Sequence, residues 1–358
     1  MLAVTHFYGQ RLKKIQKNIA INEAILVVKP TDITHFTGFP QLVPEEREAL
    51  LCITNQKAFL FHHSFSPTIT DFSELTYIPQ TNLKKLQQTL EQENIKILWL
   101  DEQNLTAEEF RFLQNHFTGK LETCSTDFFW KYRLEKDELA MVYQQKAGQI
   151  IAHVLETIPQ FFHNGITEKQ LAGKIIGLMM ELGAEGPAFP TIVAFGENGA
   201  LPHHQPTDKT LKSEMPVLID AGAKFNSYRS DMTRTYWFGQ QPTTKFLEIE
   251  EIIKTAYKKA EETIKLGPNS QEVVVIDQAA RKYIEQQGYG EEFIHTTGHG
   301  IGLDIHEPPS VSWMNHTALK AGITFTIEPG IYLKNEFGYR HENTVHLTEN
   351  SFTVLTKI

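Results

Sequence analysis

The hydrophobic and polar positions of the first 131 residues alternate between helical spacing and short apolar runs. Residues 10–19 repeat apolar positions at helical spacing, whereas residues 23–29 form an apolar run that suits a strand covered on both faces. Residues 49–54 and 57–63 are strands separated by two polar residues, which predicts a hairpin. The remaining expected elements of this α/β unit are helices over 82–92 and 106–117 and a strand over 95–100.

Long helices replace this alternation in the second part of the chain. Residues 137–162 are apolar at close to the helical period, and Thr167 with Gln170 forms a capping box that opens a helix through residue 182. Two more helices, over 244–266 and 271–287, are followed by Gly-Pro and by glycine. The change predicts a domain boundary, with domains over residues 1–131 and 132–358, as expected for a chain of 358 residues.

Carboxylates accompany the strands of the second domain. A strand over 216–221 holds Asp220, and a loop over 222–229 returns the chain so that Asp231 lies beside Asp220 before a strand over 236–238. A strand over 323–327 is interrupted at Glu328, and a strand over 340–347 carries Glu342. Residues 186–206 are rich in Pro, Gly and Asn, which predicts a long ordered loop of the kind that lines a site.

Composition narrows the class of protein. The chain is 41% hydrophobic and 22% charged, as in a soluble globular protein, with no apolar run long enough for a membrane. A net charge of −9 argues against a nucleic-acid partner. The first residues lack the apolar core of a secretory signal, and Cys52 and Cys124 have no metal-type spacing, so we expect a cytoplasmic protein without a thiolate metal site.

Three histidines cluster in the stretch from His295 to Glu307. His295, His299 and His306 are separated by four and seven positions, and glycines stand between them. These glycines let the backbone bend and let a ligand approach closely, so the stretch forms a site or its rim.

The candidate metal ligands are His299 and four carboxylates in otherwise apolar strands: Asp220, Asp231, Glu328 and Glu342. A buried carboxylate without a partner is costly and like charges repel, so four together indicate bound cations. Four negative charges balance the charge of two divalent ions. Oxygen donors with one imidazole suit manganese, cobalt and iron as well as zinc. Such a pair could activate a water and polarise a carbonyl, which is metal-assisted hydrolysis.

The same motifs carry a family resemblance. Ser-Asp-Met-Thr-Arg-Thr around Asp231, Gly-His-Gly-Ile-Gly-Leu-Asp-Ile-His-Glu, Ile-Glu-Pro-Gly and Arg-His-Glu-Asn-Thr-Val resemble the pita-bread metallopeptidases, the family of methionyl aminopeptidase, Xaa-Pro aminopeptidase and prolidase. Arg11-Leu12 through Phe36-Thr37-Gly38-Phe39 is similar to the creatinase-type N-terminal domain of the proline-specific branch. The resemblance implies an α+β fold: a C-terminal pita-bread (creatinase/aminopeptidase) domain preceded by a smaller α/β N-terminal domain.

The resemblance also implies residue roles. Asp220 would chelate the first metal, Asp231 and Glu342 would bridge both, and His299 and Glu328 would complete the second. Glu328 would also be the general base. His203, His295 and His306 would bind the scissile carbonyl and carry a proton to the leaving nitrogen, and Arg340 would orient acidic groups near the metals. The adjacent His204 is expected to be part of the wall.

The implied activity is hydrolysis of the bond between an N-terminal residue and proline in a small peptide, with two divalent ions, manganese first and cobalt, zinc or iron as alternatives. A homodimer is implied as well. Dipeptidase and aminopeptidase action both remain open, as do a catalytically silent binding module and a metal-free hydrolase of the creatinase type.

The chain departs from the family pattern at three positions. His341 stands where the family commonly has an apolar residue, and Asn343 stands where it commonly has Asp. Phe195 stands where a small residue is frequent. Asn343 removes an anion near the ligands, which bears on metal affinity and preference, but no ligand is lost.

Overall fold

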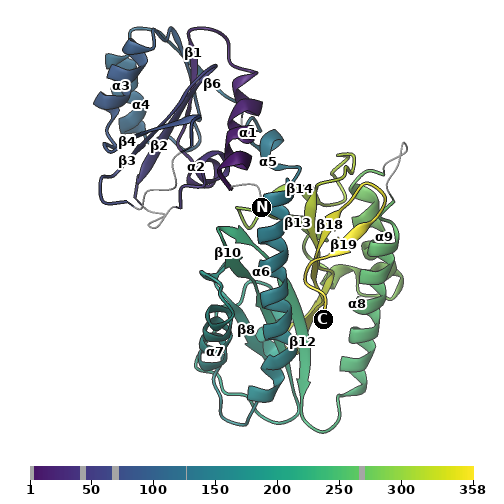
Figure 1. The fold of residues 1–358 in the computed structure, drawn as a ribbon. Helices are drawn as coiled ribbons and strands as arrows, with labels where there is room; N and C mark the ends of the chain where they lie inside the picture. Colours follow the sequence, from purple (N-terminus) through teal and green to yellow (C-terminus); the bar gives the residue numbers. More distant parts are fainter. Residues whose placement is uncertain (1–3, 41–45, 67–71, 126, 266–270) are drawn as a thin grey trace. The chain divides into compact units, whose positions relative to one another are not determined.

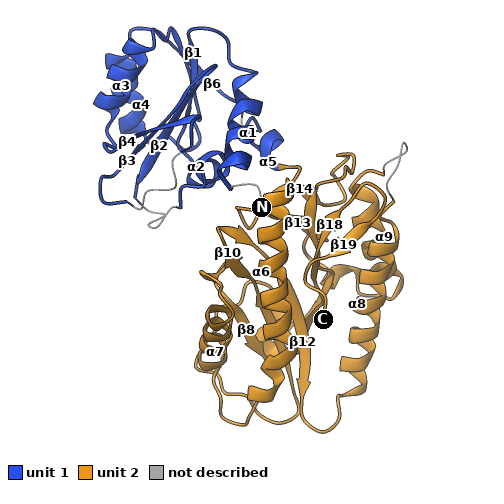
Figure 2. Ribbon diagram, viewed as in Figure 1, with its two compact units in different colours: residues 1–133 blue, residues 134–358 orange. Residues whose placement is uncertain are grey.

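The computed structural model describes residues 4–40, 46–66, 72–125, 127–265 and 271–358. The chain divides into two compact units, residues 1–133 and 134–358 (Figure 2). The division lies two residues beyond the boundary expected from the sequence.

The first unit is built on a mixed six-stranded sheet with the order β4-β3-β2-β1-β5-β6. Its strands are β1 (Glu23–Val27), β2 (Ala49–Thr54), β3 (Ala58–His62), β4 (Leu75–Ile78), β5 (Ile97–Leu100) and β6 (Lys120–Thr123). Strands β2 and β3 pair antiparallel, which confirms the predicted hairpin. Strand β1 pairs in parallel with β5. Strands β5 and β6 are also parallel, because the helix Ala107–His116 between them brings the chain back in the same direction.

Helices cover both faces of this sheet. Helices α1 (Val4–Gln16), α2 (Pro30–Thr37) and α5 (Trp130–Arg133) pack on one face, and α3 (Leu83–Gln92) and α4 (Ala107–His116) on the other. The side chains of β1 alternate between the two, since Ile25 joins the first cluster and Leu26 the second. Thr106 and Glu109 form a capping box at the start of α4.

The second unit contains two helix pairs, each packed against a sheet (Figure 1). Helices α6 (Glu138–Thr157) and α7 (Glu168–Glu181) pack against the sheet β12-β9-β8, and α8 (Thr244–Glu262) and α9 (Val274–Gln286) against the sheet β14-β13-β15-β18-β19. The capping box of Thr167 and Gln170 is present as predicted. None of the described helices combines the length and apolar character that a membrane crossing requires.

The strands of this unit are short. They are β7 (Gly186–Pro187), β8 (Ile192–Phe195), β9 (Met215–Ala221), β10 (Ala223–Phe225), β11 (Tyr228–Arg229), β12 (Met232–Phe238), β13 (Gly298–Gly300), β14 (Glu307–Val311), β15 (Thr324–Ile327), β16 (Gly330–Leu333), β17 (Phe337–Arg340), β18 (Asn343–Leu347) and β19 (Phe352–Val354). The 3-10 turns are η1 (Ile158–Phe161), η2 (Gly196–Ala200) and η3 (Gly290–Glu292).

Three sequence predictions were wrong in this unit. The expected loop over 186–206 contains β7, β8 and η2, because residues 192–195 are buried and pair with β9. The loop over 222–229 contains β10 and β11. The strand over 340–347 is two strands, because β17 pairs with β16 and β18 with β15, and Glu342 lies at the break. The predicted end of the helix over 244–266 lies outside the described residues.

Glycines allow the strand that carries His299 to lie between its neighbours. A Cβ on Gly298 would come within 2.0 Å of the Thr326 carbonyl oxygen, and one on Gly300 within 2.2 Å of the Pro308 carbonyl oxygen. No other residue fits at these two positions without moving backbone.

Candidate metal centre

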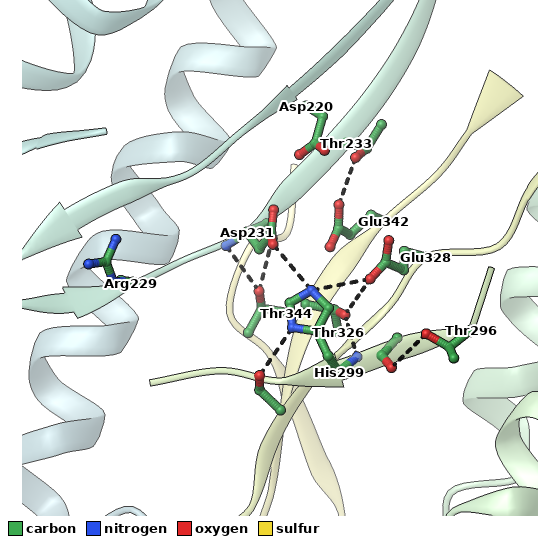
Figure 3. Close-up of polar contacts among 12 residues, drawn as sticks. Asp220, Arg229, Asp231, Thr233, Thr296, His299, Thr326, Glu328, Glu342 and Thr344 are labelled. Carbon is green, nitrogen blue, oxygen red and sulfur yellow. Dashed lines mark hydrogen bonds and ion pairs between the residues drawn. The ribbon is translucent and has the colours of Figure 1, made fainter. Parts of the chain in front are cut away.

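Predicted ligands from separate segments meet in the second unit (Figure 3). Asp231, His299 and Glu342 each offer one ligand atom, and these atoms all lie within 4.8 Å of one another. Asp231 immediately precedes β12, His299 is the middle residue of β13, and Glu342 lies between β17 and β18. The structure therefore brings together three residues that are up to 111 positions apart in the chain, from Asp231 to Glu342.

The other two predicted ligands adjoin this cluster. The Glu328 carboxylate lies 3.3 Å from His299 Nε2, and Asp231 approaches the same nitrogen at 3.6 Å. Asp220, on β9, is 9% exposed, and one of its oxygens accepts a hydrogen bond of 2.5 Å from Arg340. Strands β9 and β12 pair with Asp220 opposite Thr233, which places Asp220 and Asp231 at the same end of the hairpin.

Three carboxylates of this cluster each have a buried oxygen without a hydrogen-bond partner. Among the described residues, Asp220 Oδ1, Asp231 Oδ1 and Glu342 Oε1 are buried and accept no hydrogen bond. A buried carboxylate oxygen normally finds a donor, since leaving it unpaired costs free energy. Three such oxygens in one cluster with an imidazole are the donor set that divalent cations bind.

Repulsion among these carboxylates shifts their proton affinity. Burial raises the pKa of Asp231 well above its ordinary value, and the neighbouring charges of Glu342, Asp220 and Glu328 raise it further. Burial and the charges of Glu328 and Asp220 likewise raise the pKa of Glu342. Arg340 opposes both shifts without cancelling them. The cluster therefore has a deficit of positive charge that metal ions would supply.

Threonine hydroxyls donate hydrogen bonds to the predicted ligands. Thr233 donates a 2.6 Å hydrogen bond to Glu342 Oε2, and Thr326 donates one of 3.0 Å to Glu328. Thr344 donates to the Asp231 carbonyl oxygen at 2.9 Å. Partners of this kind fix ligand orientation and support metal affinity. The sequence reasoning missed them, although Thr233 shares the period-two face of Asp231 and could have been found from that spacing.

His295 belongs to a chain of hydrogen bonds that ends at Asp220. Its Nδ1 lies 2.7 Å from the Thr296 carbonyl oxygen, which can only accept, so Nδ1 carries the proton. Its Nε2 lies 2.8 Å from the Tyr332 hydroxyl, and that hydroxyl accepts from Arg340 at 2.7 Å. Burial lowers the pKa of His295. The sequence reasoning missed Tyr332, because a tyrosine in a short strand resembles a core residue.

The two remaining predicted histidines are exposed. The His306 ring packs edge-on against His299, with centroids 4.3 Å apart. Desolvation lowers the pKa of His306, and the neighbouring imidazoles of His299 and His203 lower it further. His203 is therefore a neighbour of His306. His204, in contrast, is buried and lies 2.9 Å from the Glu168 carboxylate, as expected of a wall residue.

A buried cluster of carboxylates and a histidine, with unpaired oxygens and set among the sheets of an α+β unit, is typical of a metal-dependent enzyme. Comparison with known proteins identifies the kind. The family model described as "Metallopeptidase family M24" matches residues 143–349, and the model described as "Creatinase/Prolidase N-terminal domain" matches residues 11–134. The chain belongs to metallopeptidase family M24.

Relatives cover nearly the whole chain. The chain is 34% identical to the Xaa-Pro dipeptidase of Pyrococcus furiosus, over 97% of this chain and 98% of that one. It resembles the structure of an Xaa-Pro dipeptidase from Bacillus anthracis with a TM-score of 0.86 and 27% identity, over 98% and 97% of the two chains. It resembles an X-Pro aminopeptidase from Thermotoga maritima with a TM-score of 0.86 and 30% identity, over 96% and 98%.

These findings confirm the predicted family and fold class. The chain has a pita-bread metallopeptidase unit preceded by a creatinase-type α/β unit, as the motifs indicated. The roles of the individual site residues stay predictions.

Proposed function

We propose that this protein is a metal-dependent peptidase that hydrolyses the bond between an N-terminal residue and proline. The observation that carries the proposal is the set of unpaired, buried carboxylate oxygens beside His299. The names of the relatives, Xaa-Pro dipeptidase and X-Pro aminopeptidase, support the choice of substrate. The retained ligand set argues against a catalytically silent binding module.

We propose that Asp220, Asp231, His299, Glu328 and Glu342 hold two divalent ions. When bound, the ions would lower the pKa of a water and polarise the scissile carbonyl. Oxygen donors with one imidazole fit manganese, cobalt, iron and zinc, and we propose manganese as the resident metal because the set is hard and lacks sulfur. The expected cytoplasmic location and homodimer remain part of this proposal.

The side chains around the ligands would handle protons. Glu328 is half-buried and its carboxylate is fixed by Thr326, so it can take a proton from the attacking water as general base. His306 is exposed, and the lowered pKa of its ring keeps it neutral near pH 7, so it can accept and pass on a proton near the leaving nitrogen. His203 would assist it from the loop after η2.

His295 and Arg340 would orient the acidic groups. Arg340 donates to Asp220, Thr233 and Tyr332, which fixes one oxygen of Asp220 and leaves the other free for a metal. His295 is neutral and its Nε2 accepts from Tyr332, so a direct bond to a scissile carbonyl would require that contact to break. We therefore assign His295 to orientation through Tyr332.

Proline at the second position explains why a dedicated site is needed. The bond before proline has no N–H and a restricted backbone, so enzymes that read an extended hydrogen-bonded chain do not accept it. A rigid site can recognise the ring. A dipeptidase and an aminopeptidase differ only in whether residues after proline are accepted, and relatives of both names are similar to this chain.

The test is a metal add-back assay. Protein stripped with chelator should lose hydrolysis of Xaa-Pro and Xaa-Pro-Yaa peptides and regain it with manganese, cobalt, zinc or iron in an order that identifies the preferred metal. The ratio of the two rates distinguishes dipeptidase from aminopeptidase. Asp231→Asn is the control that removes a ligand while keeping the side-chain shape. Equal hydrolysis by this variant, or indifference to the chelator, would overturn the proposal.

A further inference from the structure

A buried ion pair lies behind the turn that carries His306. Lys136 Nζ lies 3.1 Å from Glu307 Oε2, and their side chains are only 3% and 2% exposed. Lys136 directly precedes the N-cap of α6, and Glu307 begins β14. Neither residue is among the predicted ligands or proton carriers, so the pair needs another explanation.

Glu307 fills the inside of the turn formed by residues 301–306. Its second oxygen, Oε1, accepts a 3.0 Å hydrogen bond from the Asp304 backbone N–H. A Cβ built on Gly302 would meet Glu307 Oε2 at 2.7 Å and Oε1 at 2.8 Å, so the carboxylate lies directly against this glycine. One carboxylate thus contacts both the beginning and the middle of the turn.

The first half of the turn has further supports. Arg229 donates from Nε to the Leu303 carbonyl oxygen at 2.8 Å and from its backbone N–H to Gly302 O at 2.8 Å. Gln144 donates to the Ile301 carbonyl oxygen at 3.1 Å. These bonds fix residues 301–303. In the second half, which leads to His306, the Asp304 N–H donates to Glu307, and the His299 ring is hydrogen-bonded to the Ile305 backbone.

The His306 ring makes no hydrogen bond within the described part of the chain. It packs edge-on against His299. His306 is exposed whereas the next residue, Glu307, is 5% exposed, so the buried residue fixes the backbone from which the imidazole projects.

We propose that Lys136, acting through Glu307, is a positioning residue for His306. Lys136 supplies the positive charge that keeps the Glu307 carboxylate buried against Gly302 and Asp304. Loss of that buried ammonium would favour movement of the carboxylate toward water, because removing one partner of a buried ion pair is strongly unfavourable. The turn would then open and His306 would leave its place beside His299. The catalytic consequence rests on the proposed function of His306.

The test compares two buried ion pairs in the full-length, manganese-loaded protein. Lys136→Met removes the ammonium and keeps most of the stem. Arg133→Met is the matched control, because Arg133 pairs with Asp32 at 2.7 Å with side chains 2% and 4% exposed, in the first unit. Lys136→Met should lower kcat on an Xaa-Pro dipeptide by about 10- to 100-fold with KM and the manganese Kd within about threefold, since small misplacements of a proton carrier act on rate. Arg133→Met should leave kcat within about twofold.

A second readout does not depend on activity. Amide hydrogen exchange of metal-free protein should be faster at residues 302–306 in Lys136→Met, above all at the Asp304 N–H, and unchanged there in Arg133→Met. The double variant Lys136→Met/Glu307→Gln should recover this protection and most of kcat, because the amide keeps an acceptor for Asp304 and no charge remains buried. It also carries the test if Lys136→Met does not fold.

The outcomes separate the two proposals. If wild-type protein hydrolyses no Xaa-Pro peptide, the proposed function fails and exchange alone decides on the ion pair. If wild type is active but Lys136→Met matches Arg133→Met in kcat, or if exchange at 302–306 is unchanged, the positioning role is refuted.

Discussion

Replacing Asp231, a proposed metal ligand, should stabilise the metal-free protein. Asp231 is 5% exposed and lies in a cluster of carboxylates whose charges, together with burial, raise its pKa. Asp231→Asn keeps the shape of the side chain and removes its charge. We expect the variant to unfold at a higher temperature than wild type when no metal is present, although it should bind metal poorly.

The magnitude follows from the geometry. The ligand atoms of Asp231 and Glu342 lie within 4.8 Å, so two full charges there repel by about 3.5 kcal/mol at an effective dielectric constant of about 20. Protonation of one carboxyl relieves part of this repulsion, and Arg340 offsets another part. The expected gain in the free energy of unfolding is about 1 to 3 kcal/mol. Each kcal/mol should raise Tm by roughly 2 to 4 °C for a unit of this size.

The gain should depend on pH in a defined direction. A carboxyl whose folded-state pKa is raised binds its proton more tightly in the folded than in the unfolded protein. The folded state is therefore penalised progressively as pH rises from the unfolded value near 4 through the raised folded value. The difference between Asp231→Asn and wild type should be small near pH 5 and largest near about pH 8.

Calorimetry of chelator-treated protein at these two pH values measures the effect. Asp32→Asn is the control, because Asp32 is equally buried but paired with Arg133, so its loss should destabilise at both pH values. Added manganese should reverse the order for Asp231, stabilising wild type above the variant. A metal-free Asp231→Asn protein that is less stable than wild type at the higher pH would refute the charge-deficit reasoning.

Three further predictions concern the groups around the ligands. Thr233→Val removes the hydroxyl that donates to Glu342 and accepts from Arg340. The manganese Kd, measured by calorimetric titration, should therefore rise about 10- to 100-fold, whereas Thr233→Ser should stay near wild type. Glu168→Gln should lower the free energy of unfolding in urea by about 2 to 4 kcal/mol, because this carboxylate is fully buried and holds a hydrogen-bond network. It accepts from Phe195, Asn198, His204 and Thr207. An unchanged urea midpoint would show the network to be dispensable. Desolvation lowers the pKa of both His295 and His306. The value of kcat/KM should therefore stay constant down to pH 6.5, the ordinary histidine pKa, and fall only below it. A fall in kcat/KM with its midpoint above pH 6.5 would contradict the roles given to these two histidines.

The sequence predicted elements whose ends are determined locally. Thr106 and Thr167 begin helices through capping boxes, and the helix after Asp137 begins at the next residue, because these signals need only neighbouring residues. Strands β10 and β11 were missed because a strand of two or three residues has no period to detect. Helix α2 was missed because its buried residues include Asp32 and His35, which interrupt the apolar pattern.

The sequence predicted candidate ligands that the structure places near one another, but it did not predict the residues that support them. Carboxylates in apolar strands are visible in the sequence because burial makes them costly. The break at Glu342 was not, since it arises when the Glu342 N–H bonds to the Thr233 carbonyl oxygen on a strand 109 positions away. Tyr332 and Lys136 were missed for the same reason, because their roles depend on contacts with His295 and Glu307 that only the tertiary fold makes.

The most direct measurement counts metal ions on the folded protein. Wild type and Asp231→Asn are dialysed against manganese and analysed for bound metal per chain by mass spectrometry. We expect two tightly bound ions in wild type and a loss of both in the variant, because Asp231 is proposed to bridge them. A wild-type protein that holds no manganese, or a variant that binds as much as wild type, would contradict this expectation.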